Sequence, residues 1–238
     1  MLNFNSDKFD FWEIYERIKY CYPIGIKKDE SSIYYSYPGL KELEDIIVEN
    51  IHDAENCKSR WEDFVTELEK ELGKEIIGTT YGQAPSFSSY VLLETATLEN
   101  LTRTKELHFF VSLVGPFYSI IGQDNNTVTI EGKHYRSSNY LIVSPENEFT
   151  EIFDDLCNKI EKRFQGFRFV PFEICRKTIE GLDVRYVDKP HNSIFNALFN
   201  NHIDLNARTI GDSYFKHTDW IKEGYIDSGV GWTAYPPE

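Results

Sequence analysis

Two histidine–aspartate pairs near the C-terminus have a spacing that could bind a metal. They are His202-Ile203-Asp204 and His217-Thr218-Asp219, and His191 lies upstream of both. A His-x-Asp pair with one further His is the ligand set of a facial non-haem iron site. Such a site is normally presented on a barrel wall, whereas these residues lie in an irregular region after the main predicted sheet. We therefore expect no metal, and His202, Asp204 and His217 remain weak candidates.

Two other combinations could supply a nucleophile. Ser213, within Gly-Asp-Ser and followed by His217, could act as in a serine esterase. That motif normally opens a chain, however, and Gly-Asp-Ser is ordinary turn sequence. Cys175 precedes Arg176 and Lys177, which could lower the pKa of its thiol, but no His is close in sequence to serve as a base. The sequence therefore predicts neither a catalytic set nor a cofactor.

The charge of the chain is strongly acidic. Its 25 Lys and Arg residues stand against 39 Asp and Glu residues, which gives a formal net charge of −14. A field of this sign repels phosphate backbones and anionic lipid headgroups, so binding to nucleic acid or to a membrane surface is disfavoured. It favours a basic protein partner, or simply keeps the chain in solution.

The acidic excess is concentrated in a helical region. Residues 38–73 contain eleven acids against four bases, and an apolar stripe with helical spacing runs through them from Leu40 to Leu72. The acids fall mostly away from that stripe, so they form a negative face that could steer a basic partner. We take the following carboxylates as the candidate partner-binding residues: Glu42, Glu44, Asp45, Glu49, Asp53, Glu55, Glu62 and Asp63.

The middle of the chain is nearly neutral, as a buried sheet would be, so we expect this segment to form a sheet that is hidden inside the protein. Its most apolar stretch, residues 107–122, is shorter than the roughly 20 residues that a membrane-spanning helix needs, and Gly115-Pro116 interrupts it. β-Branched and aromatic residues indicate four to six strands over about residues 75–143. The short polar turns between most of them predict hairpins and a largely antiparallel, meandering sheet.

Helices are expected on both sides of this sheet in the sequence. Residues 6–20 and 146–164 have amphipathic spacing, and the long helical signal of residues 38–72 is expected to break near residues 55–59. We predict a single α+β domain over residues 1–238, with a helical part (1–73), a sheet (74–145) and a helix plus an irregular part (146–238). The Gly- and aromatic-rich tail from residue 227 has no clear period.

The compartment is predicted from the cysteines and the N-terminus. The four cysteines (Cys21, Cys57, Cys157 and Cys175) are far apart and form no CxxC pair, which fits neither a zinc ribbon nor a small secreted disulfide framework. The N-terminal residues show no basic segment followed by an apolar one, so a secretory signal is not expected. These features favour the cytoplasm.

The resulting hypothesis is a non-enzymatic, acidic, cytoplasmic protein that binds another protein. Its concrete version is an immunity protein that neutralises a basic bacterial toxin. The alternative is a small-ligand-binding protein, a hydrolase or a metalloenzyme whose pocket forms only in three dimensions. Its candidates on or beside the sheet are Glu94, His108, Tyr118, Glu131 and His134. An enclosed cleft with titratable groups of perturbed pKa would favour the alternative.

Overall fold

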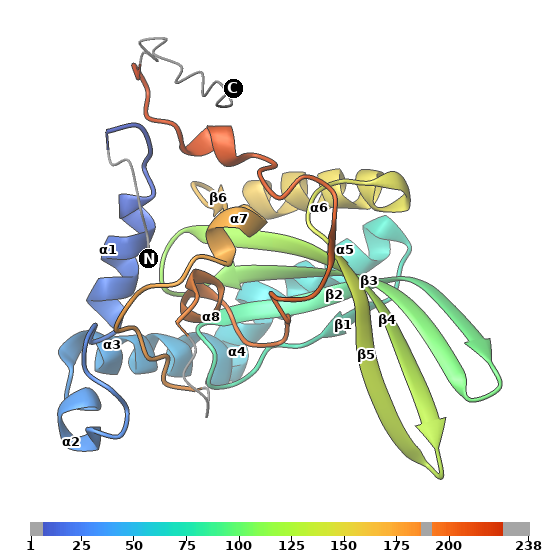
Figure 1. The fold of residues 1–238 in the computed structure, drawn as a ribbon, viewed down its shortest axis with the longest axis horizontal. Coiled ribbons are helices and arrows are strands. Elements are labelled where there is room, and N and C mark those ends of the chain that lie inside the picture. Colours follow the sequence, from blue (N-terminus) through green and yellow to red (C-terminus); the bar gives the residue numbers. More distant parts are fainter. Residues whose placement is uncertain (1–6, 187–191, 226–238) are drawn as a thin grey trace, which may run out of the picture.

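The computed structural model describes residues 7–186 and 192–225. Its centre is a sheet with the strand order β1-β2-β3-β4-β5-β7, and β6 also pairs with β4 (Figure 1). The pairs from β1 to β5 are all antiparallel. In contrast, β6 pairs in parallel with β4, and β7 pairs in parallel with β5. The predicted α+β fold with a largely antiparallel sheet is confirmed. The strands are β1 (Ile76–Gly78), β2 (Ser86–Leu98), β3 (Leu101–Ser112), β4 (Phe117–Ile130), β5 (Lys133–Ile142), β6 (Arg168–Phe169) and β7 (Thr209–Ile210).

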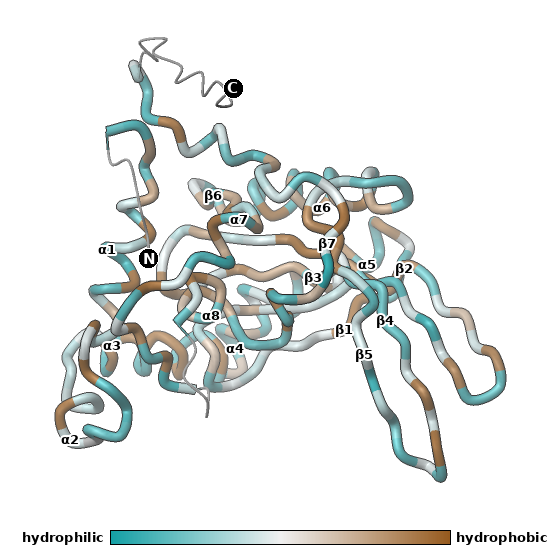
Figure 2. Tube along the Cα trace, in the orientation of Figure 1, coloured by the Kyte–Doolittle hydropathy of each residue, from teal (hydrophilic) through white to brown (hydrophobic). Residues whose placement is uncertain are grey.

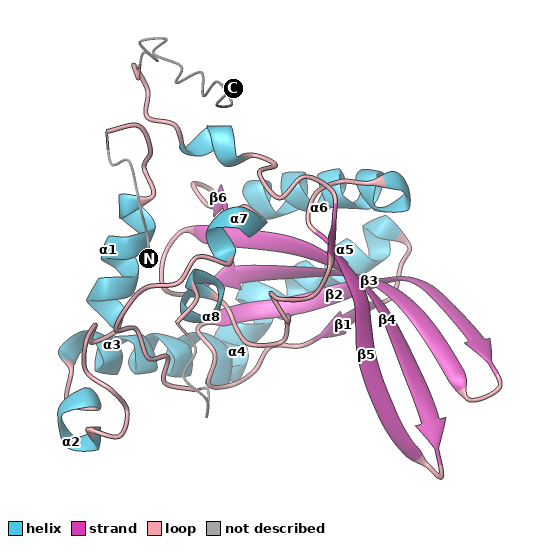
Figure 3. Cartoon of the chain, in the orientation of Figure 1, coloured by secondary structure: helices cyan, strands magenta, loops and turns pink. Residues whose placement is uncertain are grey.

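The helices come mainly before and after the four long strands (Figure 3). Those before the sheet are α1 (Trp12–Cys21), α2 (Ser31–Tyr34), α3 (Pro38–Ile47), the π-helical turn η1 (Val48–His52), α4 (Ala54–Cys57), the π-helical turn η2 (Lys58–Glu62) and α5 (Asp63–Leu72). Those after it are the 3₁₀ turn η3 (Asn147–Phe149), α6 (Thr150–Arg163), α7 (Phe172–Cys175), α8 (Ile194–Leu198) and the 3₁₀ turn η4 (His217–Trp220).

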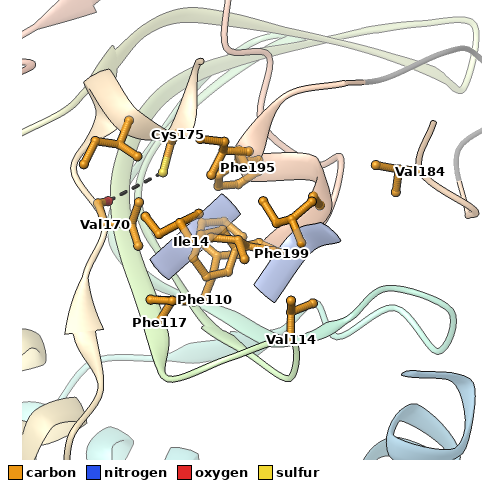
Figure 4. Close-up of a cluster of buried hydrophobic side chains, with 14 of the residues drawn as sticks. Ile14, Phe110, Val114, Phe117, Val170, Cys175, Val184, Phe195 and Phe199 are labelled. Carbon is orange, nitrogen blue, oxygen red and sulfur yellow. Dashed lines mark hydrogen bonds between the residues drawn. The ribbon is translucent and has the colours of Figure 1, made fainter. Parts of the chain in front are cut away.

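The inner half of the sheet is buried on both faces. On one side, here called the α8 face, Phe110 of β3 packs against Phe195 and Phe199, with ring centroids 5.1 and 5.9 Å apart (Figure 4). On the other side, the α5 face, Phe109 packs 5.5 Å from Trp61, which also stacks on Phe87 at 5.2 Å. Successive strand residues alternate between these two cores, which is why the sequence of β3 is apolar without interruption.

The apolar stretch 107–122 belongs to this doubly covered sheet. Its residues form the ends of β3 and β4 that lie in the body, and Gly115-Pro116 lies in the turn between the two strands. The prediction of buried strands interrupted by a turn is therefore confirmed. No helix in residues 7–186 and 192–225 has the length and apolar character needed to cross a membrane.

The long helical region before the sheet breaks earlier than we predicted. The break is at Asp53, whose backbone is extended (φ −76°, ψ 116°), rather than within residues 55–59. Asp53 also caps the next helix, because its carboxylate accepts a hydrogen bond from the Asn56 backbone N–H at 2.9 Å. Helical geometry then continues through residues 55–59, so the polar residues there are part of a helical surface.

The outer half of the sheet projects from the body as a four-stranded arm, defined here as residues 93–103 and 125–139 (Figure 1). Most of its residues are exposed or half-buried, because the helices cover only the inner half of the sheet. Register shifts next to Leu93 and Asn139 mark where the arm leaves the body. An extra residue bends a strand, so such shifts are common where a sheet changes direction. We expected the whole neutral segment to be hidden, and for the arm that expectation is wrong.

The part of the chain after α6 is largely irregular, as predicted. It contains only the two-residue strands β6 and β7 and the short helical segments α7, α8 and η4 among the described residues. The tail from residue 226 and His191 lie outside the described residues.

Candidate functional site

The predicted partner-binding carboxylates follow one helical run from α3 to the start of α5 (Figure 1). Seven of the eight are exposed, and Glu44 is half-buried. Two contacts hold the run together across the break at Asp53. The Asn56 amide donates to the Glu49 carbonyl at 3.0 Å, and Arg60 donates to the Asn50 side chain at 2.5 Å. We call these eight residues, Glu42, Glu44, Asp45, Glu49, Asp53, Glu55, Glu62 and Asp63, the acidic helical surface.

Three carboxylates of the acidic helical surface have partners within the protein. Glu42 accepts a hydrogen bond from the Tyr20 hydroxyl of α1 at 2.5 Å, which raises the pKa of Tyr20. Glu44 forms an ion pair with Arg185 at 2.7 Å. Asp53 is the helix cap described above. These three residues therefore contribute to the structure whether or not a partner binds.

The other five carboxylates form no hydrogen bond or ion pair within residues 7–186 and 192–225. They are Asp45, Glu49, Glu55, Glu62 and Asp63. Two like unit charges about 8 Å apart in water repel by about 0.5 kcal/mol. Each unpaired carboxylate that lies near another one therefore slightly destabilises the folded protein. A cationic partner would remove that repulsion.

Exposed apolar side chains border these charges. Val48 of η1 is 57% exposed and lies directly beside Glu49 in the sequence, and Tyr20, which contacts Glu42, is 55% exposed. Tyrosine is enriched in protein interfaces because it offers apolar area together with a polar group. The acidic helical surface therefore combines charge with apolar anchors.

A second group of functional interest lies on the α8 face where the arm begins. Glu106 is 2% exposed and accepts hydrogen bonds from His108 Nε2 at 2.9 Å and from Arg136 at 2.5 Å. Thr104 and Asn125 donate to the same carboxylate at 2.8 and 3.2 Å. Burial would raise the pKa of Glu106, but the hydrogen bond from His108 and the other donors outweigh it and lower that pKa below its usual value.

His108 is the neutral partner of this pair. Its burial lowers its pKa below the ordinary value, although the hydrogen bond to Glu106 opposes that effect. Nε2 therefore carries the proton that it donates, and the buried Nδ1 has no hydrogen-bond partner among the described residues. A carboxylate that orients a neutral imidazole is also found in general-base catalysis. Here, however, neither side chain lines the pocket around His202 or the pockets beside Leu68, Gly181 and Phe164.

The α5 face carries a matching group at the same level of the sheet. Asp124, 1% exposed, accepts hydrogen bonds from two nitrogens of Arg103, from Nε at 2.9 and 3.1 Å to its two oxygens and from Nη2. It also accepts one from Asn139 at 2.8 Å. Burial would raise the pKa of Asp124, but the donors, Arg103 foremost, lower it. Each face thus has one buried carboxylate bound by an arginine of the arm, which fixes the arm to the body.

The other residues that we proposed for a pocket do not converge. Glu94 pairs with Lys105 at 2.9 Å on the α5 face, and Tyr118 donates to Glu161 in the α5-face core. Glu131 and His134 lie at the tip of the β4–β5 hairpin, far along the sheet from His108. The sequence analysis missed Glu106. Its alternation with His108 on one strand, which puts both side chains on the same face, is the signal that could have identified it.

His202 and Asp204 line an open, polar pocket of about 770 Å³ between the segments 176–178, 192–196 and 201–206. Burial lowers the pKa of His202. His217 lies elsewhere, with its ring 5.1 Å from Phe9 and 5.0 Å from Phe11. The three weak metal candidates are therefore not brought together. The described residues contain no group of three or more His, Cys, Asp or Glu side chains arranged to hold a metal ion.

Cys175 does not have the depressed pKa that its basic neighbours could have produced. It is fully buried, and burial raises the pKa of its thiol to about 12. Arg176 and Lys177 instead pair with Glu173, at 2.7 and 2.6 Å. The thiol lies beside the Val170 carbonyl in the α8-face core (Figure 4), so it acts there as a small apolar group. All four cysteines are unpaired.

Searches of family models, of curated proteins and of solved structures each found no significant match to this chain.

Proposed function

We propose that this chain is a cytoplasmic protein-binding protein whose acidic helical surface holds a basic protein. Its concrete version is an immunity protein that neutralises a basic toxin. The observation that carries the proposal is the set of five exposed, unpaired carboxylates along a helical run that also exposes the apolar side chain of Val48. Complementary charge speeds association and selects the partner, while the buried apolar contact supplies affinity.

The test is a charge reversal that leaves the fold intact. The triple variant Glu49→Lys, Glu55→Lys, Glu62→Lys changes only exposed carboxylates without internal partners. It leaves Asp53 in place because that residue caps α4. A matched control reverses three exposed carboxylates outside the surface, Glu16→Lys, Asp155→Lys and Glu180→Lys, so that both variants have the same net charge.

Both variants and the wild type are expressed with an affinity tag in the native source, together with the products of neighbouring reading frames. We expect the wild type and the control to retain a basic protein that the helix variant loses at least tenfold. A wild-type chain that purifies alone under these conditions would refute the proposal. An equal loss in the helix variant and the control would show that net charge, rather than this surface, determines binding. Full retention by the helix variant would show that this surface is not the contact.

A second candidate function is the binding of a small polar ligand, and the observation that favours it is the open pocket around His202. Amides and hydroxyls form much of its lining, and its charged residues are Arg176, Lys177 and Asp204. Such groups suit a neutral sugar or an anion. Isothermal titration with inorganic phosphate and with simple sugars, compared between the wild type and His202→Ala, tests this candidate. Binding that His202→Ala abolishes would favour it over the protein-binding proposal.

A further inference from the structure

The tip of the arm carries an apolar row that crosses all four strands. Leu98 pairs with Leu101, Leu101 with Val128, and Val128 with Tyr135, so these four residues are in register from β2 to β5. Ile130 follows Val128 by two residues and therefore shares its face. We call these five residues the apolar arm row. They lie on the α5 face, because Leu101 is an even number of positions from the core residues Leu107 and Phe109 on β3 and therefore points to the same side of the sheet.

Three of the five residues of the apolar arm row are exposed, and Leu101 and Val128 between them are half-buried. Leu98 is 72% exposed, Tyr135 56% and Ile130 52%. Figure 2 shows hydrophobic segments near the ends of both hairpins, remote from the body of the molecule. The opposite face at the same level is polar, with Thr97, Thr102 and Thr127 in register there. The arm is thus apolar on one face only.

The apolar arm row does not contribute to the attachment of the arm. The base is fixed by Arg103 with Asp124 and by Arg136 with Glu106. The tips of both hairpins project away from the helices (Figure 1). Contiguous exposed apolar groups on a soluble protein usually mark an interaction site. We propose that the apolar arm row docks a basic protein that presents an apolar anchor ringed by Lys and Arg. This inference rests on the proposed protein-binding function and assigns it a second contact surface.

The charges around the row argue for a basic occupant. At the base of the same face, Lys105 is shared by Glu94 and Glu148, at 2.9 and 2.6 Å, which leaves a surplus carboxylate. At the tip, Glu99 lies next to Leu98 and Glu131 lies next to Ile130. Lys133, which is in register with Ile130, offsets one of these two charges, so a surplus carboxylate remains at the tip as well. An occupant that covers the row therefore comes within reach of carboxylates at both ends.

The two tip glutamates are held in an unfavourable backbone conformation. Glu99 has φ 51° and Glu131 has φ 49°, in the left-handed region that Gly and Asn occupy more readily. Strained residues of this kind are found disproportionately at functional sites. The glutamates therefore place negative charge at both hairpin tips despite a local cost.

A second copy of the chain fits the row less well. Four strands about 4.8 Å apart and two side-chain rows about 7 Å apart give an apolar area on the order of 300 Å². A stable interface needs about 800 Å² from each partner, so a dimer would have to bury charged surface as well. Each copy has a net charge of −14, and the copies would repel one another. A basic partner gains attraction from the same charges.

Site-specific photo-crosslinking from the full-length chain tests the docking surface. A photoreactive phenylalanine analogue replaces Tyr135 in one protein and Thr97 in the control, which projects from the opposite face of the same arm. Both are irradiated in the native source, and the crosslinked species are identified by mass spectrometry. We expect position 135 alone to capture a protein of basic isoelectric point. A crosslinked second copy of this chain, equal capture at position 97, or no capture at position 135 would each overturn the proposal.

Titration of the purified partner then separates this surface from the acidic helical surface. We expect Leu98→Ser with Tyr135→Ser to weaken binding at least tenfold without lowering the melting temperature. The double variant Glu99→Asn, Glu131→Asn should raise the melting temperature while weakening binding several-fold. If only the helix charge reversal weakens binding, the arm proposal fails and the proposed function stands. If only the arm variants do, the arm proposal stands and the acidic helical surface is not the contact.

Discussion

The buried carboxylate at the base of the arm makes the sharpest test of the structure. In the variant Glu106→Gln the shape of the side chain is kept and its negative charge is lost. The carboxylate accepts from Thr104, His108, Asn125 and Arg136, and three of these donors share one oxygen, Oε2. A glutamine amide has only one acceptor oxygen, so the variant has two choices. It points an N–H₂ group at three donors, or it keeps them on its oxygen and donates to the Thr104 hydroxyl, which then accepts, while the ion pair with Arg136 is lost in both cases.

The expected loss in the free energy of unfolding follows from these hydrogen bonds. Hydrogen bonds to a charged group contribute about 1.5–3 kcal/mol each, and breaking a buried ion pair typically costs about 3–5 kcal/mol. His108 can offset part of the loss by moving its proton to Nδ1, and Arg136 can turn to solvent because its side chain is 50% exposed. We therefore expect the free energy of unfolding to fall by about 2–4 kcal/mol. For a chain of this size, that loss lowers the melting temperature by about 5–15 °C.

Urea denaturation followed by tryptophan fluorescence measures this loss. The matched control is Glu94→Gln, the same chemical change at the neighbouring strand, where the side chain is 56% exposed and pairs only with Lys105. We expect that variant to lose less than about 1 kcal/mol, as surface ion pairs do. If Glu106→Gln unfolds within about 0.5 kcal/mol of the wild type, the carboxylate does not fix the arm as described.

Three further predictions test the pH response, a helix contact and the α5-face core. Burial lowers the pKa of His108 in the folded chain, so the contribution of the neutral imidazole to stability is complete above about pH 6.5. That contribution is lost as the pH falls from there toward the lowered pKa. Urea titrations between pH 7.5 and 5.5 should therefore show a smaller loss of stability in His108→Gln than in the wild type. Gly39→Ala should lower the free energy of unfolding by about 3 kcal/mol in the same assay, because a Cβ there would lie 1.7 Å from the Tyr20 carbonyl oxygen. The control is Gly78→Ala, because a Cβ at that position meets nothing within 4 Å. Trp61→Ala should cost about 3–5 kcal/mol by thermal denaturation, and a loss below about 1 kcal/mol would contradict its packing between Phe87 and Phe109.

Local patterns in the sequence were sufficient to predict the elements of the fold. Alternation and β-branching between residues 75 and 143 predicted the hairpins, and the apolar stripe of residues 38–72 predicted the helices before them. These predictions succeed because side-chain direction repeats every two residues in a strand and every 3.6 residues in a helix. The spacing of apolar residues along the chain therefore shows which face of an element can be buried. The position of the helix break was missed, because Asp53 ends one helix and caps the next with a side chain that could equally have remained in solvent.

The candidate sites divide in the same way. The exposure of the acidic helical surface follows from helical spacing, so its residues could be named from the sequence. The apolar arm row could not be found in this way, because its members are separated by as many as 37 positions and look like core residues. Only the register of four strands brings Leu98 and Tyr135 into one row, and only the limited reach of the helices leaves that row exposed. The sequence by itself thus determined which residues share a face of an element, and the tertiary structure decided which faces are covered, because burial depends on what packs against an element rather than on its own period.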